Sequence, residues 1–405
     1  MDNGVKNVDK NLYLAPMEGI TGPVYRNALH KYFGGADFYI TPFISPTQNK
    51  VLSHRDLEDV LPQNNEGLNV TPQILANNAE LFVKTAQALK EYGYNEVNLN
   101  LGCPSGTVVS KEKGSGLLAN LDRLDEFLDG IYNEVNGKMG MDISIKTRIG
   151  RDDTDEFHSL LVIFNEYPIK LLTVHPRIQK ELYKGKCHLD IFADAVKNSK
   201  NKLCYNGDIN TIDDFNRISG MFGGVNDFMI GRGVLKKPNL FEMIRQSDNF
   251  QEYDTMTASD IMKNCSSEEK ARNIMKNCSS EEIESHMLKG NGYAENIINT
   301  IKIESMEDSC KRGQDYSVND DVLYKKKLRD FHDEIYAGYE ELLSGERNVL
   351  FKMKELWFYM GDNFENAGKA LKLVKKAQKK EAYFAAVDRV FDCELAQTNV
   401  TKNNY

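Results

Sequence analysis

Short apolar runs alternate with amphipathic helical patterns between about residue 11 and about residue 245. In one run Val97, Leu99 and Leu101 are separated by single asparagines, which is the period-two pattern of a β-strand. Eight strands are predicted, at Leu12–Ala15, Phe38–Thr41, Val70–Ile74, Val97–Asn100, Ile143–Thr147, Leu171–Val174, Leu203–Tyr205 and Phe228–Ile230. Helices are predicted between them, for example at Asn78–Tyr92, Leu121–Val135, Asp153–Glu166 and Ile212–Met221.

Repeated strand–helix alternation favours parallel strands joined by right-handed crossovers. Eight such units match the size of a closed (β/α)8 barrel, the TIM barrel. An open doubly wound sheet is the alternative, but no G-x-G-x-x-G motif follows the first strand. We therefore expect an α/β protein whose TIM barrel occupies residues 1–246.

Four amphipathic helices are predicted after residue 321, at Leu323–Leu343, Asn348–Asp362, Asn366–Ala377 and Glu381–Phe391. They predict a C-terminal all-α helical bundle domain over residues 321–405. The stretch between the two, residues 247–320, repeats the motif IMKNCSSEE at Ile261–Glu269 and Ile274–Glu282. Two copies are too few for a solenoid, so a mobile insertion is predicted there.

The net charge of −9 at first argues against a nucleic-acid partner. However, residues 247–320 hold 15 Asp and Glu against 8 Lys and Arg, which accounts for most of that charge. Residues 322–380 hold 13 Lys and Arg against 9 Asp and Glu, although a lysine-rich face is also typical of an ordinary solvated surface. The charge distribution therefore does not exclude nucleic acid.

The sequence contains no run of about eighteen apolar residues and no apolar segment near its first residues. Neither a membrane span nor a secretory signal is therefore predicted. The seven cysteines show no CxxC spacing, so we expect no disulfide framework, no metal site and a cytoplasmic location. Cys265 and Cys278 belong to the repeated motif and are assigned no role.

In a TIM barrel, functional groups lie at the carboxyl ends of the strands, and loops after the last two strands commonly hold a phosphate. Gly207 and Gly231 would let backbone N–H groups approach such a phosphate, and Arg232 would clamp it; ordinary turn glycines are the alternative. Cys103 follows its strand on a Gly/Pro-rich turn with Lys111 and Lys113 nearby, which indicates a presented thiol or a small buried apolar side chain.

Several motifs resemble those of the tRNA-dihydrouridine synthases. They are LAPMEGITGPVYR (Leu14–Arg26), NLNLGCPSGTVVSKEKGSG (Asn98–Gly116), IKTRIG (Ile145–Gly150), VHPR (Val174–Arg177), YNGDI (Tyr205–Ile209) and MIGRG (Met229–Gly233). The run RNVLFKMKELWFYM at Arg347–Met360 is similar to the helical domain of that family. The resemblance covers about residues 11–245 and 322–390, and leaves the acidic stretch between them unexplained.

The resemblance implies an FMN-dependent oxidoreductase that reduces particular uridines of tRNA to 5,6-dihydrouridine with NADPH or NADH. It implies FMN contacts from Pro16, Met17, Glu18, Gln73, Lys146, His175, Asn206, Gly207, Asp208, Gly231 and Arg232. Cys103 would donate a proton, and Asn100, Arg148 and Arg177 would bind the substrate. Lys111–Gly116 would be a mobile loop that closes over the uridine. We expect tRNA as partner, no membrane, no protein partner and a monomer.

Reduction of the C5=C6 bond needs a hydride at C6 and a proton at C5. A cysteine thiol is mainly protonated at neutral pH and can supply that proton, although nearby lysines would favour the thiolate. Two other functions stay open at this point. One is an FMN barrel oxidoreductase acting on a free pyrimidine such as dihydroorotate, and the other is a non-catalytic RNA-binding protein.

Overall fold

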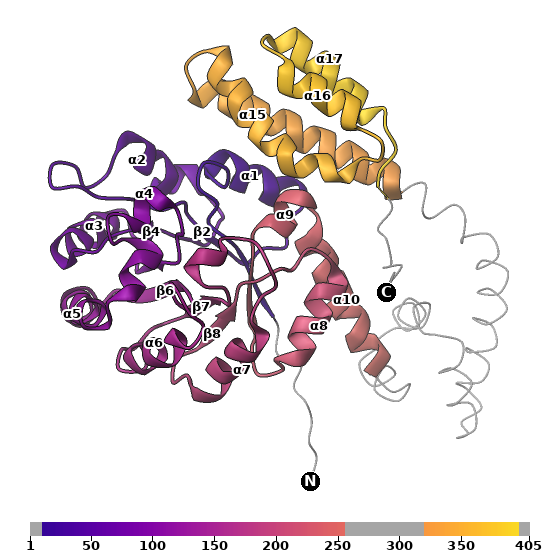
Figure 1. The fold of residues 1–405 in the computed structure, drawn as a ribbon. Coiled ribbons are helices and arrows are strands. Elements are labelled where there is room, and N and C mark those ends of the chain that lie inside the picture. Colours follow the sequence, from indigo (N-terminus) through magenta and orange to yellow (C-terminus); the bar gives the residue numbers. More distant parts are fainter. Residues whose placement is uncertain (1–9, 256–319, 397–405) are drawn as a thin grey trace, which may run out of the picture. The chain divides into compact units, whose positions relative to one another are not determined.

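The computed structural model describes residues 10–255 and 320–396 (Figure 1). Of these, residues 10–241 and 331–396 belong to one compact unit, and residues 242–255 and 320–330 to another. The repeated motif with Cys265 and Cys278 lies outside the described residues. A helix, α10 (Leu240–Thr255), runs through the predicted boundary at residue 246.

Nine short strands form one parallel sheet in the order β3-β2-β1-β9-β8-β7-β6-β5-β4. They are β1 (Asn11–Leu14), β2 (Phe38–Ile40), β3 (Val70–Thr71), β4 (Gln73–Ile74), β5 (Glu96–Leu101), β6 (Asp142–Arg148), β7 (Leu172–His175), β8 (Leu203–Tyr205) and β9 (Asp227–Ile230). The end strands β3 and β4 are consecutive in the chain, separated only by Pro72, so the sheet closes on itself. Proline lacks the N–H that a continuous strand would donate, while its carbonyl still accepts from Asn98 at 2.8 Å.

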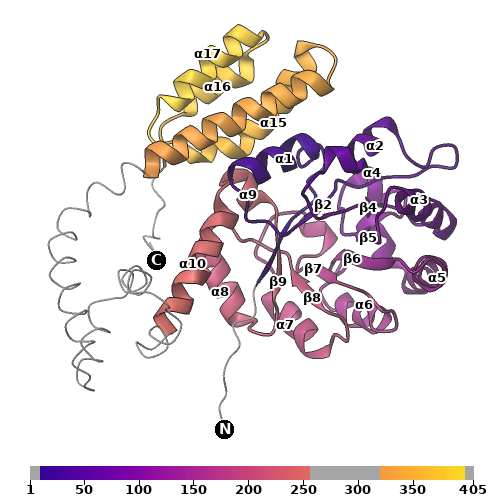
Figure 2. The ribbon, with the colours of Figure 1, turned by 180° about the vertical axis from the view of Figure 1, so that it is seen from behind.

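The predicted eight-stranded TIM barrel is therefore confirmed. Helices cover the outside of the strand ring, as Figure 2 shows from behind. They are α1 (Pro23–Tyr32), α3 (Ala79–Glu91), α5 (Leu121–Ile131), α6 (Glu156–Phe164), α7 (Leu189–Asn198) and α8 (Ile212–Met221). Asn78, Asn120 and Thr211 cap α3, α5 and α8 by accepting a backbone N–H three residues ahead.

Shorter helices lie in the loops at the strand ends. They are α2 (His54–Val60), α4 (Gly106–Val109) and α9 (Arg232–Lys236), with 3-10 turns at Pro62–Asn64, Gly114–Ala119 and Gln179–Glu181. A π-helical stretch, Tyr132–Lys138, continues α5 through the predicted helix end at Val135 and three residues past it. Within the described residues, no helix has the length and apolar character needed to cross a membrane.

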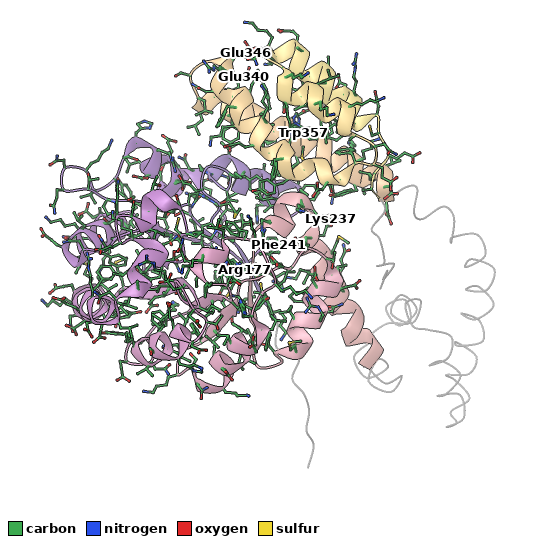
Figure 3. All side chains as sticks on the ribbon, viewed as in Figure 1. Arg177, Lys237, Phe241, Glu340, Glu346 and Trp357 are labelled. Carbon is green, nitrogen blue, oxygen red and sulfur yellow. The ribbon has the colours of Figure 1, made fainter. Side chains whose placement is uncertain are left out.

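The four predicted C-terminal helices are present. They span residues 320–342, α15 (Glu346–Met360), α16 (Gly368–Lys376) and α17 (Lys380–Phe391). Their core is aromatic: the Trp357 indole donates to Tyr383 Oη at 2.9 Å, and that hydroxyl lies 2.7 Å from Nε2 of the buried His332. Figure 3 shows Trp357 among the side chains of these helices. Residues 331–396, the helical region, thus have a core of their own.

The helical region contacts the barrel through apolar and polar groups. Phe331 packs edge-on against Tyr25 and Phe33 of the α1 segment, with ring centroids 5.6 and 5.4 Å apart. Lys352 of α15 donates to the carbonyl of Gly19 at 2.7 Å. Because Gly19 follows the first strand, this bond fixes α15 beside the carboxyl end of the barrel.

Candidate active site

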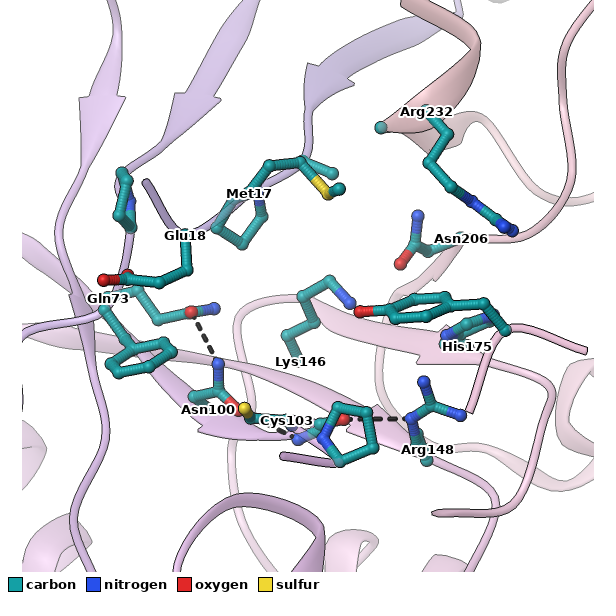
Figure 4. Close-up of a pocket in the computed structure, with 18 of the residues that line it drawn as sticks. Met17, Glu18, Gln73, Asn100, Cys103, Lys146, Arg148, His175, Asn206 and Arg232 are labelled. Carbon is teal, nitrogen blue, oxygen red and sulfur yellow. Dashed lines mark hydrogen bonds between the residues drawn. The ribbon is translucent and has the colours of Figure 1, made fainter. Parts of the chain in front are cut away.

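A pocket of about 260 Å³ lies at the carboxyl ends of the strands (Figure 4). Thirteen of the fifteen residues predicted from the strand ends line it: Pro16, Met17, Glu18, Gln73, Asn100, Cys103, Lys146, Arg148, His175, Asn206, Gly207, Gly231 and Arg232. The other two, Arg177 and Asp208, are not among its lining residues. Groups from seven strand ends thus meet in one space, since parallel strands of a closed barrel end on one rim.

Cys103 is held in place through its backbone on both sides. Asn100 Oδ1 accepts the N–H of Gly102 at 3.0 Å and that of Cys103 at 2.9 Å, which tightens the turn after β5. The Cys103 carbonyl accepts from the Ser115 hydroxyl at 2.8 Å and from the Ser115 N–H at 3.2 Å. The thiol therefore projects from a turn whose peptide groups are fully engaged.

The segment Lys111–Gly116 does not fit the prediction of a mobile closing loop. Gly114, Ser115 and Gly116 are buried in a 3-10 turn against Cys103. Gly114 has φ +56°, and a Cβ there would lie 2.8 Å from the Cys103 carbonyl oxygen. Only Lys111 and Glu112 are exposed in this segment. The glycines that suggested flexibility instead permit close packing.

Burial raises the pKa of the Cys103 thiol above its ordinary value. The carboxylate of Glu18 acts in the same direction, whereas Lys146 and Arg148 act to lower it. The opposing cations are thus pocket residues and not the predicted Lys111 and Lys113. The net direction keeps the thiol protonated at neutral pH.

Buried amides form a chain across the inner face of the barrel. Asn100 Nδ2 donates to Gln73 Oε1 at 2.7 Å, and Gln73 Nε2 donates to Asn98 Oδ1 at 2.7 Å. Asn98 continues to Ser144, which donates to Glu96 at 2.6 Å. Asn100, which was predicted to face a substrate, thus uses its side-chain amide to connect the Cys103 turn with Gln73. All three residues line the pocket.

Lys146 extends from β6 into the pocket, between Met17 and Cys103 in Figure 4. Burial, with a contribution from Arg148, lowers the pKa of Lys146 to about 8. Among the described residues, its ammonium has no hydrogen-bond or ion-pair partner. A partly desolvated ammonium without a partner is costly, so this position favours a ligand that offers acceptor atoms or negative charge.

Arg148 is largely committed to the backbone of neighbouring loops. Its Nε donates to Gly102 O at 2.9 Å, Nη1 to Ile178 O at 2.9 Å and Nη2 to Leu182 O at 2.6 Å. Three of its five N–H groups are used in this way. Arg148 therefore braces the pocket wall, and at most two N–H groups remain for a ligand.

Arg177 is buried and orients its neighbours. Its Nη1 lies 3.1 Å from Nε2 of His175, and because a guanidinium can only donate, that nitrogen accepts. Burial and the surrounding cations hold the pKa of His175 well below its usual range, so the ring is neutral with its proton on Nδ1. Arg177 also pairs with Asp208, which in turn accepts from Arg232 at 2.6 Å. The structure thus gives Arg177 and Asp208 supporting positions behind the lining.

Of the two predicted phosphate-binding glycines, Gly207 is sterically required and Gly231 is tightly packed. A Cβ on Gly207 would collide with the ring of Tyr205, and a Cβ on Gly231 would lie 3.3 Å from Cβ of Ala15. Arg232 begins α9 directly after Gly231 and is one-third exposed at the pocket. Bare backbone and a guanidinium at one corner of the pocket suit an oxyanion ligand.

Two tyrosines of the lining were not predicted. Tyr183, from the loop after β7, stacks on His175 and lies 5.3 Å from the Arg148 guanidinium and 5.0 Å from that of Arg232. Tyr359 comes from α15 of the helical region. The only sequence signal for Tyr359 was its place in the run Arg347–Met360, because its entry into the pocket depends on how α15 packs.

Known proteins with similar sequences point to one family. A family model described as dihydrouridine synthase matches residues 13–325. The tRNA-dihydrouridine(16) synthase of Pseudomonas putida is 28% identical over 257 residues, which cover 62% of this chain and 77% of that protein. A probable tRNA-dihydrouridine synthase of Staphylococcus aureus is 29% identical over 239 residues, 56% of this chain and 70% of that protein.

Among solved structures, morphinone reductase matches 58% of this chain and 86% of its own with 10% identity and a TM-score of 0.43. The old yellow enzyme from Trypanosoma cruzi matches 58% and 88%, also with 10% identity and a TM-score of 0.43. The family model covers about three quarters of the sequence. The chain therefore belongs to the dihydrouridine synthase family.

Proposed function

We propose that this protein is a flavin-dependent tRNA-dihydrouridine synthase, which reduces the C5=C6 bond of specific uridines in tRNA with NADPH or NADH as reductant. One observation carries the proposal: the thiol of Cys103 and the unpartnered ammonium of Lys146 line the same pocket. A proton donor and a cation facing one space are what the reduction of a conjugated carbonyl compound requires.

The residues of the pocket fit a flavin mononucleotide. Lys146 would offer its ammonium to the acceptor edge of the ring, with Gln73 beside it. Gly207, Gly231 and Arg232 would hold the phosphate, and Asp208 would fix the Arg232 guanidinium by their ion pair. Met17 and Pro16 supply apolar contact. When bound, the flavin supplies the hydride.

The chain's own residues would supply the proton, position the thiol that carries it and stabilise the charge that develops. Cys103 would deliver its thiol proton to C5 of the uracil, and the raised pKa keeps that proton available at neutral pH. Asn100 fixes the turn that carries the thiol. Arg148 and neutral His175 place N–H donors in the same pocket. These donors would stabilise the negative charge that develops on the uracil carbonyl.

The RNA would approach through the helical region. A pocket at the carboxyl ends of the barrel strands admits only a base that has left its stack, as in other enzymes that modify bases. Lys369, Lys372, Lys375 and Lys376 on α16 are all exposed and would attract phosphates. We assign residues 321–405 to tRNA binding on this basis, and the acidic residues 247–320 to an insertion between barrel and helices.

Mapping dihydrouridine in tRNA from cells that lack the gene tests the proposal directly. We expect uridine in place of dihydrouridine at defined positions of this tRNA. The wild-type gene should restore the dihydrouridine, and a gene carrying Cys103→Ala should not. Position 16 is the first to inspect because it appears in the name of the Pseudomonas putida relative. Unchanged tRNA together with turnover of a free pyrimidine would instead support the alternative oxidoreductase.

A further inference from the structure

Two aromatic side chains of α15 form a continuous edge that leads into the pocket. Tyr359 lines the pocket, and the ring of Phe358 stands edge-to-face on it with centroids 5.0 Å apart. Phe358 is 68% exposed. Single exposed apolar side chains are common on protein surfaces. Phe358 differs from Phe351, which is 61% exposed on the same helix, because it touches a ring of the pocket wall.

The edge is held at a fixed position relative to the pocket. Lys352 of α15 bonds to the Gly19 carbonyl, next to Glu18 of the lining. Just past the carboxyl end of α15, Asn363 Nδ2 donates to the Lys236 carbonyl at 2.5 Å, and Lys236 Nζ pairs with Asp362 at 2.9 Å. Lys236 closes the short helix that begins at Arg232, so both sides of the pocket mouth are fastened to α15.

The charges around this edge are compatible with a polyanion. Two carboxylates lie on the same part of the helical region, and each is paired with a lysine: Glu355 with Lys352 at 3.3 Å and Asp362 with Lys236. Arg232 adds a positive charge inside the mouth. An RNA backbone therefore meets acids that are each paired with a cation. Arg232 shares the single carboxylate of Asp208 with Arg177, so these three side chains keep a net positive charge.

We propose that the aromatic edge of Phe358 and Tyr359 stacks the nucleotide that adjoins the target uridine in the RNA chain. The inference rests on the proposed function, because it needs a base inside the pocket. A base in the pocket is tied to its neighbour by a single phosphodiester, so the neighbour lies at the mouth. That neighbour has lost the target base as its stacking partner, and an exposed aromatic ring takes the place of the lost base.

The test compares Phe358→Ala with Phe351→Ala, which removes a comparably exposed phenylalanine from the same helix. We expect Phe358→Ala to raise KM for tRNA on the order of tenfold with kcat and flavin content nearly unchanged. Phe358→Trp restores the wild-type KM, because it restores a stacking surface, and Phe351→Ala leaves KM unaltered. An unaltered KM in Phe358→Ala overturns the inference.

Photo-crosslinking identifies the occupant. Phe358→p-benzoylphenylalanine should crosslink to tRNA at a nucleotide directly beside the one converted to dihydrouridine. A crosslink only to remote nucleotides, or to protein instead of RNA, contradicts the inference even when the wild-type enzyme is active. A wild-type enzyme that forms no dihydrouridine in any tRNA would instead contradict the proposed function, so the two failures are distinguishable.

Discussion

The backbone N–H of Cys103 donates to the side-chain oxygen of Asn100, three residues earlier, at 2.9 Å. The same asparagine donates to Gln73 on the neighbouring strand. The turn that carries the thiol is therefore coupled to the residue predicted to contact the flavin edge. A change at either residue is transmitted through one amide side chain.

Replacing Cys103 by alanine should abolish dihydrouridine formation, with a loss of at least about a hundredfold in rate, because no other thiol lines the pocket within the described residues. Reduction of the flavin by NADPH or NADH, whichever is the reductant, should persist, since it needs no proton from Cys103. Stopped-flow absorbance measures the first half-reaction, and tRNA analysis measures the second. Equal dihydrouridine yields in mutant and wild type would disprove the role.

Alkylation should report the raised pKa of Cys103. A thiol whose pKa lies above its ordinary value remains protonated and unreactive at pH values where a free cysteine already reacts. The rate of carbamidomethylation at Cys103, followed by mass spectrometry, should therefore rise at a higher pH than the rate at a cysteine in a free, unfolded reference peptide. In Glu18→Gln the midpoint should move down, because one carboxylate that opposes the thiolate is lost. A midpoint below that of the free peptide would contradict this.

Flavin affinity should fall as the pH passes about 8, where Lys146 loses its proton. A pKa of about 8 leaves most molecules charged at pH 7 and most neutral at pH 9. Fluorescence titration with FMN at both values should show a loss on the order of tenfold, the worth of one charge-assisted hydrogen bond. Lys146→Arg keeps its charge throughout, so its affinity should not change over the same interval. A similar decline in Lys146→Arg would assign the effect to another group.

Arg232→Ala should weaken flavin retention on the order of tenfold, because it removes the guanidinium at the proposed phosphate corner. Arg232→Lys should be intermediate, since lysine keeps the charge and loses the planar fork. Flavin content after gel filtration provides the measurement, and Arg217→Ala, an exposed arginine on α8, is the matched control. Full flavin content in Arg232→Ala would refute the phosphate assignment.

Periodicity was sufficient for the barrel, because each buried parallel strand shows itself locally as an apolar run. The residues at the carboxyl end of the barrel were predictable for the same reason. Once the strands are placed, residues at their carboxyl ends, such as Lys146 and Asn206, must lie at the same end of the barrel. Three features depend on tertiary packing and could not be predicted. Arg177 turns behind the lining to Asp208, Gly114 packs against Cys103, and Tyr359 arrives from a helix far along the chain.

Trp357 is the single tryptophan in 405 residues, and it is buried in the core of the helical region. Its ultraviolet emission therefore reports the integrity of those helices alone, without background from indoles in the barrel. A bound flavin would report the barrel at visible wavelengths. With flavin bound, the protein would carry two separate optical signals, one for each of the elements that meet at Tyr359, and their order of loss during unfolding could be read from one sample.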